Sequence, residues 1–274
     1  SSAGSSPYFA AAASICAASA AGSAAGKSRR FVAPASVQER RTEPRLAKRA
    51  QPAPVAAVGP PVAGFASQAV MAGWGAPLQV EDAERKAVNA ALDCQAALLD
   101  FNRDVVADYL PSGRLGTRIG VATGYAIAGN MGSAQRLNYT LTGDMVNLAA
   151  RLEGANKEYG TAFMVSELTA KALGEDFVLR RLDRLIVKGK TEPIVVFEVL
   201  GRRGAVDDAV LARIAAFERG LARHDARDFA AARAIFQKHA SADPPSRVYA
   251  ERCETYLATP PPADWRGEFA LKTK

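Results

Sequence analysis

Two side chains with complementary chemistry lie four residues apart in the stretch LNYTLTGDMVNLAARL, residues 137–152. Asn147 and Arg151 follow a Gly-Asp turn, and a spacing of four places them on one face of a helix. A guanidinium group on such a face can hold a phosphoryl group, and an amide beside it can orient a sugar oxygen. The alternative is a surface helix with a polar edge, and the spacing alone does not decide between the two.

The pair needs a helix that presents it, and the sequence predicts one over residues 144–158. The apolar stripe of this helix recurs at steps of four and three residues: Leu148, Leu152, Ala155 and Tyr159. We expect Asp144 to be the N-cap, because its carboxylate can accept hydrogen bonds from the amides of the first turn. Asn147 and Arg151 then lie about a quarter turn from the stripe, at the edge of the buried side.

The neighbouring segments alternate between strand and helix patterns. TRIGVATG and YAIAGNMG, residues 117–132, predict two strands of a hairpin that turns near Gly124. Residues 81–108 predict an amphipathic helix, and SELTAKAL predicts a short helix capped by Ser166. Two further strands, FVLRRLDRLIVKG and PIVVFEVL, are joined by KGKTEP. The pattern indicates an α+β fold with helices on one side of a mixed sheet.

The character of the chain changes after Gly201. Three amphipathic helices are expected over residues 209–223, 229–240 and 246–258, with RHDARDF and ADPPS as the turns. This small all-α tail, residues 205–258, resembles a tetratricopeptide unit with a cap. One such unit cannot bury its own apolar face well. We therefore expect it to dock on the preceding domain, for packing or partner contact and not for chemistry.

The chain of 274 residues has a formal net charge of +7, and most of it lies at one end. Residues 1–76 hold eight Lys or Arg and two Asp or Glu, which gives +6. This stretch is rich in Ala, Pro and Arg, so a solvated basic tail explains the charge better than nucleic-acid binding does. Three cysteines without C-x-x-C spacing predict a reducing, cytoplasmic compartment, and with only two histidines they argue against a zinc site.

The first part of the chain shows no sustained hydrophobic period. We predict that residues 1–64 are a disordered low-complexity leader, and that order begins near Phe65 with a domain over residues 65–201. The uncharged run from Tyr8 to Ala25 is mostly Ala and Ser, which is too weakly hydrophobic for a membrane-spanning helix. No membrane contact is expected from this chain itself.

Two segments carry motifs that are specific in order and spacing: RIGVATGYAIAGNMGSAQRLNYTLTGDMVNLAARLEGANKEYGT and LDRLIVKGKTEPIVVFEV. From about Gln68 to Gly201 the chain resembles the catalytic domain of class III adenylate and guanylate cyclases. The resemblance implies a ferredoxin-like domain, here without its first strand.

In that family two domains pair head to tail. Each site takes metal-binding aspartates from one subunit, and the Asn, the Arg and the base-recognition residues from the other. Two Mg²⁺ or Mn²⁺ ions activate the 3′-hydroxyl group and steady the leaving pyrophosphate.

Carried over residue by residue, the resemblance assigns Asn147 to the ribose and Arg151 to the charge on the α-phosphate. Thr140 falls at the base-selecting position, where adenylate cyclases have Asp or Thr and guanylate cyclases a residue such as Cys. A threonine hydroxyl can accept from the adenine amino group, so Thr140 favours ATP. Lys188 or Lys190 matches the phosphate-binding Lys, and we favour Lys188. Without the resemblance both lysines would be read as a charged turn.

The metal-binding half of the family pattern is missing. The first aspartate belongs to a Phe-x-Asp-Ile-x-Gly-Phe motif on the opening strand, and residues 1–67 contain nothing like it. Ser67 and Gln68 stand where the second aspartate, in a Gly-Asp pair, is expected, and an amide cannot replace a carboxylate as an anionic magnesium ligand without a large loss of affinity. The adenine-contacting Lys expected near Val62 is also absent. We therefore assign no metal ligand here, and expect the ligands from a partner subunit or from missing sequence.

The family reaction converts ATP to 3′,5′-cyclic AMP and pyrophosphate, in intracellular signalling, with a second cyclase domain as partner. We expect this chain to be inactive alone, because neither subunit of a homodimer would supply the aspartates. A first alternative is a degenerate cyclase that lends Asn147 and Arg151 to another subunit. A second alternative is an interaction module whose working part is the tail. Tail pieces such as PPPADW resemble extensions of bacterial cyclases with membrane-bound sensors, so any membrane tether would come from missing sequence.

The family pattern ends abruptly upstream of Gln68, where Ala, Pro and Arg, which have GC-rich codons, take over. Our hypothesis is that residues 1 to about 66 are read from a shifted frame or a misassembled gene. Sequencing the transcript across this region tests it. If the upstream DNA encodes no Asp-Ile motif in any of its three frames, the hypothesis fails.

Overall fold

The computed structural model describes residues 8–19, 62–66, 69–76, 79–106, 114–133, 136–186 and 192–270. Its strands are β1 (Tyr8–Ser19), β2 (Val62–Ala66), β3 (Ala69–Trp74), β4 (Leu115–Ser133), β5 (Arg136–Thr142), β6 (Phe163–Ser166), β7 (Phe177–Ile186), β8 (Ile194–Arg202) and β9 (Glu268–Ala270). Its helices are α1 (Ala83–Phe101), α3 (Asp144–Tyr159), α4 (Glu167–Leu173), α5 (Asp208–Asp225), α6 (Phe229–Gln237) and α7 (Pro244–Ala258), and a π-helical turn (Asn102–Val106) follows α1.

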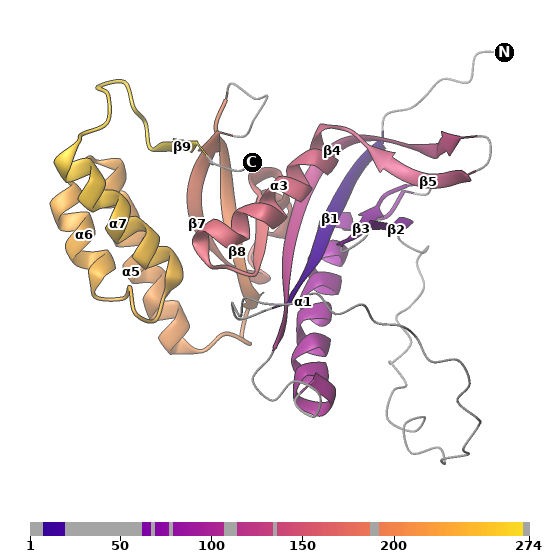
Figure 1. The fold of residues 1–274 in the computed structure, drawn as a ribbon, viewed down its shortest axis with the longest axis horizontal. Helices are drawn as coiled ribbons and strands as arrows, with labels where there is room; N and C mark the ends of the chain where they lie inside the picture. Colours follow the sequence, from indigo (N-terminus) through magenta and orange to yellow (C-terminus); the bar gives the residue numbers. More distant parts are fainter. Residues whose placement is uncertain are drawn as a thin grey trace, which may run out of the picture.

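The strands form one mixed sheet in the order β2-β3-β1-β4-β6-β8-β7-β9, and β5 pairs with the outer part of β4 (Figure 1). β4 and β6 are parallel, whereas β8 is antiparallel to both β6 and β7. This arrangement confirms the α+β class expected from the sequence.

Helices cover both faces of the sheet. Ile119 and Val121 of β4 and Phe163 of β6 belong to a buried cluster with α1 and α4, whereas Ala122 and Met164 belong to a cluster with α3. Successive side chains of a strand point to opposite faces, so α1 and α4 lie on one face and α3 on the other. The expectation of helices on one side was wrong, because the central strands are apolar on both faces.

The opening strand of the sheet is a second difference from the sequence prediction. β1 lies between β3 and β4 and is antiparallel to both, with Ala11 opposite Trp74 on one side and Thr123 on the other. The predicted disordered leader, residues 1–64, is wrong for residues 8–19 and 62–64, which belong to β1 and β2, and its other residues lie outside the described part of the chain. The sequence of β1 carries no charge and includes the strand-favouring residues Phe9 and Ile15, so its composition suits a strand that is paired on both sides.

β4 is a single long strand, and the predicted turn at Gly124 does not occur. Gly124 pairs with Ala10 in β1, and the chain reverses only after Ser133 to form the β4–β5 hairpin. A Cβ atom at Gly124 would lie 3.2 Å from the Cβ of Met145. The glycine therefore leaves room for the start of α3 instead of forming a turn.

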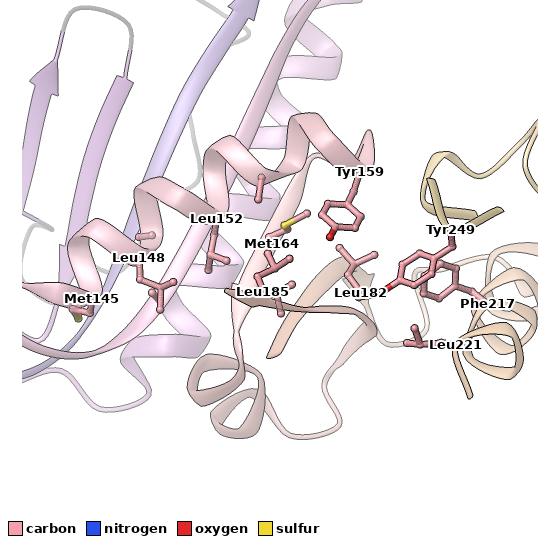
Figure 2. Close-up of a cluster of buried hydrophobic side chains, with 14 of the residues drawn as sticks. Met145, Leu148, Leu152, Tyr159, Met164, Leu182, Leu185, Phe217, Leu221 and Tyr249 are labelled. Atoms are coloured by element: carbon pink, nitrogen blue, oxygen red, sulfur yellow. Dashed lines mark hydrogen bonds between the residues drawn. The ribbon is translucent and has the colours of Figure 1, made fainter. Parts of the chain in front are cut away.

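The tail docks on the domain, as predicted. In Figure 1 the helices α5, α6 and α7 form a bundle beside β7, and β9 adds a short parallel strand to β7. Figure 2 shows buried side chains running from Met145 and Leu148 on α3 through Leu182 to Phe217 and Tyr249 in the tail. Among the described helices, none combines the length and the hydrophobicity needed to cross a membrane.

Candidate functional site

Helix α3 presents the pair that opened the sequence analysis. The predicted apolar stripe is buried in the structure, together with Met145, Ala149 and Asn156. Asn147 is exposed and Arg151 is half-buried. The two side chains are one turn apart at the edge of the buried side of α3, and neither is fully buried, so both remain available to a ligand or a partner chain.

The start of α3 differs from the prediction. The N-cap is Gly143, not Asp144, and as a glycine it has no side chain that could cap the helix. Gly143 has a φ of 145°, and a Cβ atom there would lie 3.1 Å from the backbone oxygen of Tyr125. Asp144 is instead the first helical residue, where the positive end of the helix dipole stabilises its negative charge.

Side chains and a glycine hold α3 close against β4. A Cβ atom at Gly120 would lie 2.1 Å from the backbone oxygen of Ala149, so only glycine allows this approach. The buried amide of Asn156 donates to the backbone oxygen of Ile119 at 2.9 Å. The guanidinium group of Arg118 donates to Glu153 at 2.9 Å. The helix that carries the candidate pair is thus fixed along its middle.

Thr140 lies on β5, opposite Gly129 of β4, and is half-buried. β5 leads through Gly143 into α3, so Thr140 precedes the candidate pair on the same continuous segment. Lys188 and Lys190 lie outside the described residues, between the end of β7 at Ile186 and the start of β8 at Ile194. The structure therefore tests neither lysine.

A cleft of about 430 Å³ opens beside the start of α3. The residues that line it come from β4, α3, the end of β6, α4 and the start of β8: Thr123, Gly124, Tyr125, Asp144, Met145, Leu148, Ser166, Glu167, Leu168, Pro193 and Ile194. Thr123 and Ser166 are buried, and each forms a hydrogen bond with the hydroxyl group of Thr169, at 2.9 and 3.0 Å. The volume and the mixed lining are typical of a small-molecule site.

Two apolar side chains on β4 are exposed, and the sequence analysis missed them. Tyr125 is 65% exposed and Ile127 is 67% exposed. They are two residues apart on one strand, so they lie on the same face of it. The signal in the sequence was this alternation, which the predicted turn at Gly124 concealed. A partner chain that covered them would remove apolar surface from water.

The described residues do not fit a two-metal site. They contain no group of three or more His, Cys, Asp or Glu side chains that could hold an ion. The strand at the opening position, β1, consists of YFAAAASICAAS and has no carboxylate in its sequence. A hard divalent cation needs oxygen ligands, carboxylates above all, so β1 offers none of the ligands that the resemblance places on an opening strand.

Comparison with known proteins gives a consistent result. Residues 68–199 match the family model of the adenylate and guanylate cyclase catalytic domain. Over 143 residues the chain is 36% identical to adenylate cyclase 1 of Rhizobium meliloti (strain 1021). The aligned region covers 52% of this chain and 21% of that protein. The chain is also 36% identical, over 118 residues, to an adenylate cyclase of Anabaena cylindrica, covering 41% and 24%.

Among solved structures, the adenylyl cyclase CyaB from P. aeruginosa is similar, with a TM-score of 0.48 and 25% identity. That match covers 54% of this chain and 74% of the other. The chain spans less than a quarter of the length of the two bacterial relatives named above.

Proposed function

We propose, from the premise that residues 68–199 are a class III adenylate and guanylate cyclase domain, that this chain supplies half of an adenylate cyclase active site. The reaction would form 3′,5′-cyclic AMP from ATP. The 3′-oxygen of ATP loses its proton and attacks the α-phosphorus. The bond between the α-phosphorus and the oxygen that bridges to the β-phosphate breaks, which releases pyrophosphate. The observation that carries the proposal is that Asn147, which is exposed, and Arg151, which is half-buried, lie one turn apart on a firmly seated α3.

Each residue of this half-site has a role that its chemistry supports. The guanidinium group of Arg151 would stabilise the negative charge that develops at the α-phosphate, since its donors match phosphate oxygens. The amide of Asn147 would orient the ribose. The hydroxyl group of Thr140 would accept from the adenine amino group and favour ATP over GTP. Lys188, with Lys190 as the alternative, would bind the terminal phosphates.

The metal-binding half would come from a partner. Class III cyclases use Mg²⁺ or Mn²⁺, and the described residues of this chain offer no fitting ligand set. We therefore propose that the carboxylates belong to a second cyclase domain. The exposed Tyr125 and Ile127 support such a partner, because they place apolar surface close to the cleft and the start of α3.

Mixing this chain with a second subunit tests the proposal. The second subunit would be a class III cyclase that keeps its two metal aspartates but has its own Asn and Arg replaced by Ala. We expect cyclic AMP from the mixture and not from either chain alone. Arg151→Ala should lower the rate of the mixture about 100-fold, as expected for the loss of a charge-stabilising donor.

The matched control is Lys157→Ala, an exposed cation in the last turn of the same helix, which should leave the rate unchanged. Turnover of manganese-ATP by the purified chain alone, at a rate above its Arg151→Ala variant, would show a complete site and contradict the half-site. An unchanged rate of the mixture with Arg151→Ala would exclude this residue from catalysis.

The alternative of an independent tail module has less support. Phe217, Leu221 and Tyr249 of the tail share one buried cluster with Leu182 and Leu185 of the sheet (Figure 2). An isolated tail would expose to water the surface of these side chains that packs against the sheet. We therefore propose that the tail works as part of the catalytic domain.

A further inference from the structure

The C-terminal helix α7 touches the end of the helix that carries the candidate catalytic pair. α3 ends at Tyr159, and Gly160 caps it in the left-handed conformation with a φ of 65°. A Cβ atom at Gly160 would lie 2.6 Å from the Cβ of Pro244, the first residue of α7. Any residue other than glycine at this position would displace α7. The C-terminal end of α3 therefore touches the N-terminal end of α7.

A buried cluster of three polar side chains joins α3, β7 and α7. The hydroxyl group of Tyr159 donates to the carboxylate of Asp183, and the guanidinium group of Arg252 donates to the same oxygen at 2.7 Å. A second nitrogen of Arg252 donates to the oxygen of Tyr159 at 3.3 Å. The three residues are 0%, 2% and 8% exposed. We call this group the α3 clamp.

The protein matrix around the α3 clamp restricts its geometry. The guanidinium group of Arg252 lies over the ring of Phe269 at 3.8 Å and over the ring of Tyr249 at 4.6 Å. The register of β7 against β8 shifts between Arg181 and Asp183, and the backbone oxygen of Leu182 accepts a hydrogen bond from Tyr249 at 2.7 Å. The bulge and the stacked rings leave the Arg252 side chain little freedom to move.

The charges within the α3 clamp depend on one another. Burial and the negative charge of Asp183 raise the pKa of Tyr159, which keeps its hydroxyl group protonated as a donor. Removing Arg252 would leave the carboxylate of Asp183 buried with only neutral donors, which is costly in a low-dielectric interior. The end of α3 would then have to move so that water reaches Asp183.

We propose that Arg252 is a positioning residue for catalysis, which acts by fixing the axial position and rotation of α3 through Asp183 and Tyr159. Tyr159 lies eight residues beyond Arg151 on one helix, about 12 Å along the axis. A shift at Tyr159 is therefore transmitted to Arg151 and Asn147. The inference rests on the proposed function, and it makes the tail a working part of the half-site.

The chain contains a matched control for this idea. Arg180 is also buried, donates to Asp243 at 2.8 Å and to Glu198 at 2.9 Å, and lies over the ring of Phe217 at 4.8 Å. It joins the tail to β7 and β8 and its contacts given above include no residue of α3 itself, although its partner Asp243 is the N-cap of α7 and precedes Pro244. Loss of Arg180 should weaken tail docking in general, whereas loss of Arg252 should act on α3 in particular.

The experiment compares Arg252→Met, Tyr159→Phe and Arg180→Met in the full chain. Hydrogen exchange should become about tenfold faster in residues 152–159 with Arg252→Met, and change much less there with Arg180→Met. Mixed with the aspartate-bearing subunit, Arg252→Met should lower kcat about tenfold at nearly unchanged KM, since misplacement affects the transition state more than binding. Tyr159→Phe keeps the ring and the fold, and should show smaller effects of the same kind.

Equal effects of Arg252→Met and Arg180→Met on exchange and kcat would overturn the proposal, because the tail would then only stabilise the fold. An exchange effect specific to Arg252→Met without any change in kcat would overturn it as well. If the unmodified mixture forms no cyclic AMP, the proposed function fails and the catalytic role of Arg252 fails with it. In that case the exchange data still decide separately whether the clamp holds α3.

Discussion

Asn147 and Arg151 are presented differently although they share a helix face. Asn147 lies in the first turn and is exposed, whereas Arg151 is half-buried one turn later. The apolar stem of an arginine can lie along a protein surface while its charged head stays available. This leaves the guanidinium group with less rotamer entropy to lose when a phosphate binds, which suits the role proposed for Arg151.

The proposed preference for ATP depends on a single hydroxyl group. Replacing Thr140 with Cys removes a good hydrogen-bond acceptor for the adenine amino group. We expect Thr140→Cys to lower the ratio of kcat/KM for ATP over GTP about tenfold, the usual value of one hydrogen bond. The ratio is measured in the mixture with the aspartate-bearing subunit.

Thr142→Cys is the control for this measurement, because Thr142 is exposed, two residues further along β5 and on the same face of the strand. It should leave the ratio unchanged. If Thr140→Cys also leaves it unchanged, Thr140 does not select the base.

At the scale of elements, the contact between α3 and β4 decides where the candidate pair lies. Gly120 lets the helix backbone approach the strand, and Asn156 ties the helix to the backbone of Ile119. The absence of a side chain at Gly120 and the buried amide of Asn156 thus both help to fix the position of α3 on the strand. These contacts are long-range in sequence, since Asn156 lies 37 positions after Ile119.

Two glycine substitutions on this contact should have opposite effects. Gly120→Ala would place a Cβ atom 2.1 Å from the backbone oxygen of Ala149 and 2.4 Å from the backbone nitrogen of Glu153. We expect it to lower the free energy of unfolding by about 3 kcal/mol, since backbone atoms cannot move aside cheaply. Gly154→Ala meets no atom within 4 Å and lies inside α3, so it should raise the same free energy by about 1 kcal/mol.

Urea unfolding of both variants at one temperature measures these differences. A tolerated Gly120→Ala would mean that α3 does not lie as close to β4 as the structure places it. A destabilising Gly154→Ala would indicate that the outer side of α3 is covered in solution, for example by a second chain.

At the scale of the molecule, sheet and tail share one core. The cluster that begins under α3 at Met145 continues to Phe236 and Cys253 in the tail. Because the domain and the tail bury the same side chains, we expect them to unfold together, in one transition. Titration of a buried group in the tail should therefore change the free energy of unfolding of the whole fold.

Alkaline pH should weaken the fold through Cys253. Burial raises the pKa of this thiol to about 11 from an ordinary value of 9.0, against the opposing positive charges of Arg252 and Arg233. Between these two values the unfolded chain loses a proton that the folded chain keeps. The free energy of unfolding should therefore fall as the pH rises through this range, and the contribution of Cys253 is fully present only below about pH 9.

Urea unfolding across this pH range, with Cys253→Ala beside the unmodified chain, measures the effect. The variant should show a shallower fall. Cys94→Ala is the control for a thiol outside the core, since Cys94 is exposed, and it should change the slope less. If Cys253→Ala leaves the slope unchanged, the thiol does not contribute.

The sequence by itself determined what repeats over a few residues. The stripe of α3, the Ser166 cap and the three tail helices were predictable, because helical period and capping depend on neighbours along the chain. The motif over residues 137–152 identified Asn147, Arg151 and Thr140 as the candidate site through the family resemblance. Their roles remain predictions.

Only the tertiary structure decided the contacts between distant segments. It placed β1 between β3 and β4, continued β4 through Gly124, and brought Tyr159 and Arg252, 93 positions apart, to one carboxylate. Neither charge nor period along the chain fixes such contacts, because they depend on which surfaces the folded core leaves to be buried together. The α3 clamp therefore could not be found from the sequence alone.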